Sequence, residues 1–263
     1  LTGVGPLIAW RKSSLESLKR AFLWPMAAGA AVAITLAALG VRNFYALVSF
    51  ALCTFVAVTV LIEFYKGASA IKAKTGANLL VSMVELTHRN TPRYGGYLVH
   101  MGVVLMFIGF TGKAFDRDTT VEVTPGSVVK LGSYELRTNP VVNAQNENYI
   151  SEALPINVSK NGEDLGVLSP EHRVYIASKQ PTSEVAIRRR LNEDLYLNFA
   201  GMSADNQRAV LQAYVFPLVS WIWIGYWVVL IGTLICLTPA KTRMAWPRTQ
   251  VVGIAGKHEQ VEK

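Results

Sequence analysis

The sequence predicts a polytopic α-helical membrane protein with an extracytoplasmic antiparallel β domain inserted before the last transmembrane helix. Apolar residues make up 51% of the 263 residues and gather in blocks of about twenty, the length that crosses a bilayer. The segment 115–213 instead alternates short apolar runs with turn residues. It holds 13 acidic and 10 basic residues, whereas the remainder holds 5 acidic and 16 basic residues. This asymmetry indicates membrane orientation and not nucleic-acid binding.

The N-terminal region is expected to contain two complete spans after the end of a truncated one. Residues 1–10 are apolar and stop at Arg11-Lys12, so we expect the tail of a transmembrane helix and a chain that is a fragment. Residues 11–21 are expected to form a cytoplasmic connection, because basic residues mark that side. Residues 22–39 and 44–64 are expected to be transmembrane helices, and the short turn between them makes them antiparallel neighbours.

Residues 65–93 are expected to form a basic cytoplasmic loop that contains an interfacial helix. Asn78 is a predicted N-cap, and apolar residues follow it at helical spacing: Leu79, Leu80, Met83 and Val84. Glu63 precedes this loop at the end of a span. We interpret it as an interfacial carboxylate that reaches water, with a proton relay as the alternative.

Residues 94–114 are expected to form a transmembrane helix with one ionisable side chain, His100, in its first third. Such residues are costly in a membrane, so function is the default hypothesis. A neutral imidazole binds iron, copper or zinc and commonly serves as an axial haem ligand. Gly96 and Phe107 share its helix face, where a porphyrin could approach the glycine and pack on the ring. A pure packing role for the glycine and the histidine stays open.

Residues 115–213 are expected to form the β domain. The clearest signal is Asn161-Gly162 between two apolar runs, because this pair supplies the positive φ angles of a type I′ hairpin turn. The other expected strands are Thr119–Val123, Ser127–Leu131, Ser133–Thr138, Tyr149–Lys160, Leu165–Leu168, Val174–Ala177, Glu184–Arg188 and Leu195–Phe199.

Residues 214–238 are expected to form the last span, and residues 239–263 a basic cytoplasmic tail. The aromatic residues of this span, Trp221, Trp223 and Trp227, are interpreted as interfacial anchors, with a cofactor or quinone site as the alternative. The remaining candidate ligands stand alone in the sequence and are assigned no chemistry: Cys53, Cys236, His88, His172 and His258.

Several sequence segments occur in an order that carries a family resemblance. They are Gly5-Pro6-Leu7 with Trp10-Arg11, residues 93–102 (RYGGYLVHMG), Asn148-Tyr149, residues 170–175 (PEHRVY), residues 184–187 (EVAI), Asp194-Leu195-Tyr196 and residues 217–223 (PLVSWIW). In this order they resemble the C-terminal part of CcmF-type cytochrome c haem lyases. The likeness covers essentially the whole chain.

The resemblance implies a haem-handling protein of cytochrome c maturation in the bacterial inner membrane, with the β domain on the periplasmic side. Such a haem lyase receives haem from a haem chaperone and attaches it to the CxxCH cysteines of apocytochrome c, which a thiol-reductant or delivery subunit brings. By this resemblance His100 is an axial ligand of haem b. The second axial histidine is expected from the missing N-terminal half. Quinol is the implied electron donor.

Two departures and two alternatives accompany the resemblance. The tryptophan-rich outer segment and the two outer histidines of the family belong to the N-terminal half, so the present chain alone is expected to be inactive. His172 stands where the family more often has lysine.

One alternative is a non-catalytic membrane scaffold of the maturation complex, which would lack haem. The other is a transporter component, which would be expected to show discontinuous helices or paired intramembrane charges.

Overall fold

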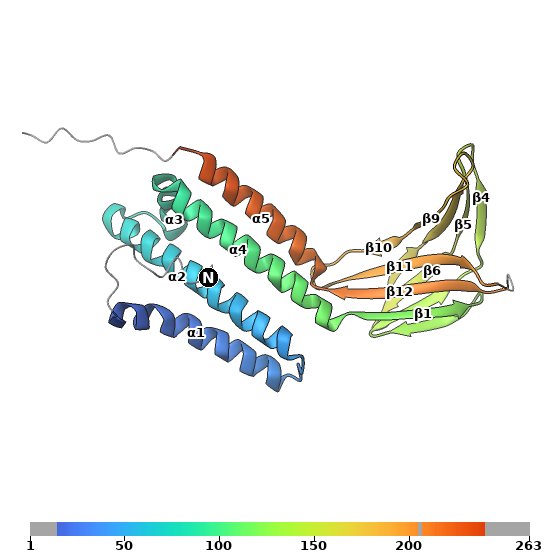
Figure 1. Ribbon diagram of the computed structural model, residues 1–263, viewed down its shortest axis with the longest axis horizontal. Coiled ribbons are helices and arrows are strands. Elements are labelled where there is room, and N and C mark those ends of the chain that lie inside the picture. The colour runs from blue at the N-terminus through green and yellow to red at the C-terminus, as the bar shows by residue number, and fades with distance from the viewer. Residues whose placement is uncertain (1–14, 205–206, 240–263) are drawn as a thin grey trace, which may run out of the picture.

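The computed structural model describes residues 15–204 and 207–239, with helices at one end of the molecule and strands at the other (Figure 1). The helices are α1 (Leu15–Ala38), α2 (Phe44–Thr75), α3 (Leu79–Arg89), α4 (Thr91–Thr111), the 3₁₀ turn η2 (Gly112–Phe115) and α5 (Val219–Leu237). Within this part of the chain, α2, α4 with η2, and α5 are long and apolar enough to cross a membrane, and α1 contributes a shorter apolar stretch. The predicted fold class is confirmed. The expectations for 1–10, for His258 and for the tail beyond residue 239 lie outside the described residues.

The first two helices form the predicted antiparallel hairpin, but α2 is longer than expected. The Asn43 side chain accepts a hydrogen bond from the Ala46 backbone N–H at 3.1 Å and so caps its start. The helix continues beyond the predicted end at residue 64 as far as Thr75. The extra turns are retained because Ala68 and Ile71 are buried against α3 and α4.

The basic connection is therefore mostly helical. Asn78 caps α3 as predicted, since its side-chain oxygen accepts a hydrogen bond from the Leu80 backbone N–H at 2.7 Å. Leu86 of α3 packs with residues of α2 and with Tyr94 and Tyr97 of α4. The segment predicted as a loop over 65–93 thus contains the end of α2, all of α3 and the first residues of α4.

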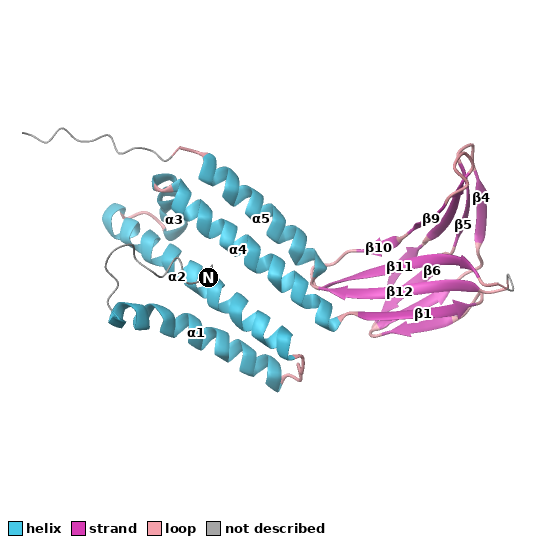
Figure 2. Ribbon diagram, in the orientation of Figure 1, coloured by secondary structure: helices cyan, strands magenta, loops and turns pink. Residues whose placement is uncertain are grey.

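The β domain lies between α4 and α5 and contains twelve described strands in three antiparallel sheets (Figure 2). The first sheet has the order β1-β12-β11-β10, with β1 (Arg117–Val123), β12 (Ala209–Pro217), β11 (Glu193–Met202) and β10 (Ala186–Arg188). The second is β2-β3-β6-β7, with β2 (Val128–Leu131), β3 (Tyr134–Thr138), β6 (Ile156–Lys160) and β7 (Glu163–Leu168). The third is β4-β5-β8-β9, with β4 (Val142–Gln145), β5 (Tyr149–Ala153), β8 (Glu171–Tyr175) and β9 (Pro181–Glu184).

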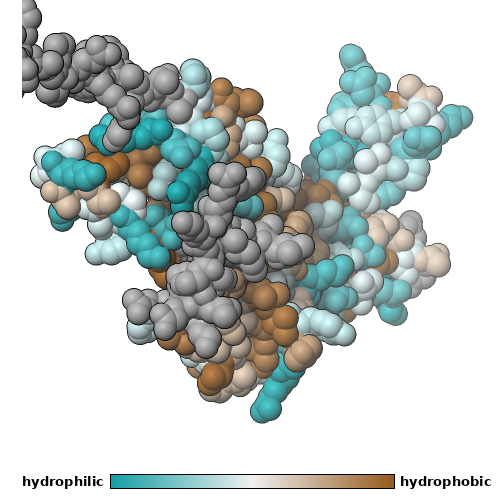
Figure 3. Space-filling model, turned by 60° about the vertical axis from the view of Figure 1, so that its left-hand side comes forward, coloured by the Kyte–Doolittle hydropathy of each residue, from teal (hydrophilic) through white to brown (hydrophobic). Residues whose placement is uncertain are grey.

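The first two sheets form a sandwich, and the third projects from it as an arm (Figure 1). Fully buried side chains from both faces make the sandwich core, including Leu136 and Ile156 from one sheet and Phe199 and Leu211 from the other. In a space-filling view, apolar side chains cover much of the helical surface, whereas the arm is mainly hydrophilic (Figure 3). This distribution is what a membrane-embedded bundle with a solvated domain requires.

Two boundaries of the β domain differ from the sequence prediction. The segment Tyr149–Lys160 is two strands, because Pro155 interrupts it and directs β5 and β6 into different sheets. The last helix begins at Val219, so the range 214–217 assigned to a span belongs to β12. The strands β4 and β12 were not predicted. The predicted strand Glu184–Arg188 contains only the last residue of β9 together with β10, and β8 covers Glu171–Tyr175 where Val174–Ala177 was predicted.

The Asn161-Gly162 hairpin is confirmed. Asn161 and Gly162 have φ angles of 51° and 86°, and Lys160 pairs with Glu163 across the turn. Both central residues are thus in the left-handed region that a type I′ turn needs.

Lys160 also connects the two sheets of the sandwich. Its ammonium donates a hydrogen bond to Glu193 of β11 and lies 4.9 Å from the centre of the Tyr134 ring. The hydrogen bond that Lys160 donates to Glu193 raises the pKa of Lys160 above its ordinary value. We expect Lys160→Met to lower the unfolding free energy by about 1 kcal/mol and the melting temperature by about 4 °C, because the pair is only partly buried.

The pH dependence follows from the direction of this shift. A raised folded-state pKa gives stabilisation that is complete below the unfolded pKa of lysine and is lost as the pH rises through the folded value. The difference in unfolding free energy between wild type and Lys160→Met should therefore be constant near neutrality and shrink above about pH 10.4. Thermal unfolding followed by the β-sheet circular dichroism signal measures it. Lys130→Met, which removes a well-exposed pair with Glu135, is the control and should change little.

Candidate functional site

His100 lies on α4 beside an apolar groove between α4 and α2. The side chain is half-buried and makes no hydrogen bond to another described residue, so both ring nitrogens are available for coordination. The groove has a volume of about 380 Å³. Its lining residues are Tyr45, Val48, Ser49, Leu52, Cys53 and Val56 of α2 and His100, Val103, Val104 and Phe107 of α4.

The two residues expected to accompany His100 occupy different positions. Phe107 lines the same groove and is 54% exposed, so its ring can meet a ligand lying there. Gly96 is not part of the groove lining, although it lies one turn before His100. A Cβ atom added at Gly96 would meet no described atom within 4 Å, so this part of α4 is open to a close neighbour.

The orientation of α4 is fixed by glycines that the sequence analysis did not single out. Gly95 and Gly102 lie opposite Gly232 and Gly225 of α5, and the two helices pack more extensively than any other described helix pair. A Cβ added at Gly102 would lie 2.7 Å from the Gly225 carbonyl oxygen, and one at Gly225 would lie 2.6 Å from the Gly102 carbonyl oxygen. At about 100° per residue, His100 lies roughly 140° around the helix from Gly95. The close contact with α5 therefore turns the imidazole toward α2.

Two polar contacts join α2 to α4 along the outer part of the groove. The hydroxyls of Ser49 and Thr111 are 2.5 Å apart, and the Cys53 thiol donates a weak hydrogen bond to the Val104 carbonyl oxygen at 3.8 Å. These contacts set the separation of the two groove walls.

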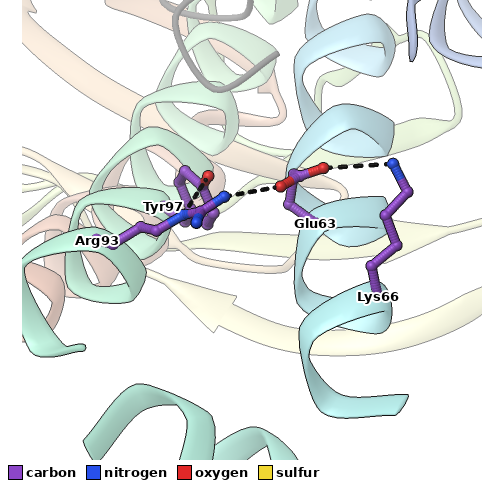
Figure 4. A network of polar contacts seen from close by, with 4 residues as sticks. All are labelled: Glu63, Lys66, Arg93 and Tyr97. Carbon is purple, nitrogen blue, oxygen red and sulfur yellow. Dashed lines mark hydrogen bonds and ion pairs between the residues drawn. The ribbon is translucent and has the colours of Figure 1, made fainter. Parts of the chain in front are cut away.

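A charged network joins the same two helices at the other end (Figure 4). Arg93 of α4 donates through Nη2 to Glu63 Oε2 at 3.0 Å and through Nε to the Tyr97 hydroxyl at 3.0 Å. Lys66 lies 3.4 Å from Glu63 Oε1. Glu63 is therefore an ion-pair partner of α4 and not merely a carboxylate that reaches water. The sequence did not indicate this pairing, because 30 residues separate Glu63 from Arg93.

The other two histidines in the described part of the chain, His88 and His172, lie outside the groove. His88 is exposed at the end of α3, and His172 lies on β8 opposite Glu152 and Ser183 in the strand register. Across 15–204 and 207–239, no group of three or more His, Cys, Asp or Glu side chains is placed to hold a metal ion. A metal at His100 would therefore need most of its ligands from elsewhere.

These residues fit a haem better than a bare metal ion. A porphyrin supplies four nitrogen ligands itself and needs from the protein only axial ligands and an apolar slot. His100 provides one imidazole with no competing hydrogen bond, and the groove provides an apolar wall ending in Phe107. No second histidine lines the groove.

The helices and the sandwich define a class of protein: a multi-pass membrane protein in which a β sandwich joins the last two transmembrane helices. The family model described as the CcmF C-terminal beta-sandwich matches residues 114–217. A solved structure titled cytochrome c haem lyase CcmF superposes with a TM-score of 0.75 at 20% identity, covering 90% of this chain and 38% of that one. The segment 114–217 therefore matches the C-terminal domain of CcmF proteins, and the fold of the chain is that of the C-terminal part of the solved structure.

Curated relatives agree with this assignment. The cytochrome c-type biogenesis protein CycK of Rhizobium meliloti is 27% identical over 97% of this chain and 37% of its own length. The CcmF protein of Haemophilus influenzae is 26% identical over 92% of this chain and 37% of its own length. The chain thus spans little more than a third of the relatives that it matches.

Proposed function

We propose that this chain is the C-terminal portion of a cytochrome c haem lyase that holds a b-type haem in the membrane through His100. The observation that carries the proposal is the imidazole beside an apolar groove, with no hydrogen-bond partner among the described residues, in a chain similar to CcmF proteins. When bound, such a haem supplies one-electron redox chemistry. The protein contributes an axial nitrogen, an apolar slot that excludes water and a rigid helix that fixes the ring plane.

The complete protein would attach haem to the CxxCH cysteines of apocytochrome c on the outer face of the bacterial inner membrane. The relatives' names place them in cytochrome c biogenesis, and this supports a haem chaperone, apocytochrome c and its delivery subunit as partners and quinol as electron donor. In this chain, the β domain continues directly from α4 and returns to α5, so it would lie next to the membrane, on the outer face if the basic segments are cytoplasmic. The chain alone would lack the parts that act on apocytochrome.

The absorption spectrum of the purified complete protein tests the haem proposal. We expect a low-spin b-type spectrum, because two histidine ligands give a strong-field, six-coordinate iron. The 263-residue chain alone should bind haem weakly or not at all, because it supplies one of those ligands. A complete protein without haem would contradict the proposal and favour the scaffold alternative.

The orientation is tested by labelling introduced cysteines with an impermeant maleimide. Exposed Ala73 on α2 serves as the inner labelling position, and exposed Glu147 serves for the β domain. We expect Glu147→Cys to react from the periplasm and Ala73→Cys only after the inner membrane is opened, because the basic segment stays inside. The reverse labelling pattern would invert the topology.

A further inference from the structure

The charged network lies beyond the groove, whose lining on α4 begins at His100, and Arg93 shares a face of α4 with His100. Arg93 precedes His100 by seven residues, which is two helical turns or about 10 Å along the axis. Tyr97 lies between them, one turn before His100. By this spacing Tyr97 and Arg93 follow the imidazole toward the end of the span. Figure 4 shows the far part of this row, where Glu63 of α2 pairs with Arg93.

The guanidinium of Arg93 is held in place but retains unused donors. Its Nε and Nη2 groups donate to Tyr97 and Glu63, and its carbon lies 5.6 Å and 5.7 Å from the ring centres of Tyr97 and Tyr94. Within the described chain, Nη1 has no hydrogen-bond partner, and the side chain is 49% exposed. A preorganised guanidinium loses less conformational entropy when it binds a further group.

The local charge favours an anion. Glu63 carries one negative charge, and Arg93 and Lys66 carry two positive charges, so the network has a net charge of +1. A planar guanidinium matches a carboxylate in geometry, and such charge-assisted hydrogen bonds are about twice as strong as neutral ones. The charged network lies past the end of an apolar groove. Together they suit a molecule that is mostly apolar and carries a carboxylate at one edge.

We propose that Arg93, positioned by Glu63 and Tyr97, binds a carboxylate of the porphyrin whose iron His100 ligates. The inference rests on the proposed function, because it requires the haem to occupy the groove. The inference specifies how the porphyrin is oriented. The carboxylate edge of the ring points to the inner end of α4, and the apolar edge lies along Val103 and Phe107. An anionic lipid phosphate shares the same recognition chemistry, so the test must separate these two sources.

The test compares haemin with haemin dimethyl ester, in which both carboxylates are blocked. Each is added to the haem-free complete protein in neutral detergent, and the dissociation constant is measured from the low-spin absorption band. We expect the wild type to bind haemin about tenfold more tightly than the ester, the ratio expected for one charge-assisted hydrogen bond. Arg93→Gln should lose this preference, and Arg93→Lys should retain part of it.

Arg89→Gln is the matched control. Arg89 pairs with Glu85 on the exposed side of α3, four residues before Arg93, so the same change in charge should leave the preference intact. Equal affinities of haemin and ester in the wild type would overturn the proposal without any variant. So would a preference that persists in Arg93→Gln, because the carboxylate would then bind elsewhere, and Arg93 would be left as a lipid contact.

The same measurement distinguishes failure of the haem proposal from failure of the Arg93 carboxylate proposal. If the wild type takes up neither haemin nor its ester in a low-spin form, the haem proposal falls and the carboxylate site falls with it. If both bind with a low-spin spectrum but equally well, only the orientation through Arg93 is wrong.

Discussion

His100→Ala is expected to abolish the b-type haem of the complete protein and cytochrome c maturation with it. An axial nitrogen cannot be replaced by the neighbouring groove residues, which offer only apolar side chains, a buried thiol and two hydroxyls. The haem content per protein and the low-spin absorption band measure the effect, and we expect most of the haem to be lost. Holocytochrome c yield in cells measures the consequence.

Two controls separate coordination from packing. His88→Ala and His172→Ala should keep both haem and maturation, since neither side chain lies at the groove. The alanine at position 100 leaves a cavity, so external imidazole in the millimolar range should restore part of the low-spin band, which a packing defect would not allow. An unchanged low-spin spectrum in His100→Ala would leave His100 as a helix-packing residue.

The parts of the fold that the sequence predicted correctly depend on local signals. Hydropathy over about twenty residues located the long helices, and the predicted side-chain cap at Asn78 forms where a short polar residue precedes an apolar run. The Asn161-Gly162 turn was predictable because its φ angles demand those residue types. Each signal is contained within a few neighbouring residues.

The errors occurred where tertiary contacts override a local pattern. Residues 214–217 are apolar enough for a span, yet Val215 is buried in the sandwich core while Tyr214 and Phe216 make edge-to-face contacts with Tyr196 on the other face. The alternation over 209–215 was the missed signal, since buried residues recur there at every second position. Helix α2 continues past its apolar part because α3 and α4 cover it.

The candidate site was only partly predictable. His100 stood out because an ionisable residue in an apolar span is rare. Its direction depends on α5, and the sequence does carry a signal for that contact: glycines at seven-residue spacing in both helices, 95, 102 and 109 in one and 225 and 232 in the other. The pairing of Glu63 with Arg93 had no such signal, because it depends on how α2 and α4 are placed.

The glycine contact predicts a second large effect, this time on stability. Gly102→Ala should lower the melting temperature of the chain in detergent, because its Cβ would lie 2.7 Å from backbone atoms of both Gly225 and Val229. Backbone atoms cannot rotate away, so α4 and α5 would have to separate, and overpacking of this kind costs about 1–3 kcal/mol. The melting temperature should fall by at least several degrees.

Gly96→Ala on the same helix is the matched control. Its Cβ would meet no described atom within 4 Å, and alanine favours a helix over glycine by about 1 kcal/mol, so this variant should melt at the same temperature or higher. The 263-residue chain is the appropriate material, because it should hold little haem against Gly96. The added Cβ in Gly225→Ala would approach Gly102 from α5, so this variant should lower the melting temperature in the same way. The double variant should lower it by less than the sum of the two single effects. If Gly102→Ala and Gly96→Ala melted alike, α4 and α5 would not be in backbone contact, and the orientation of His100 toward α2 would lose its structural basis.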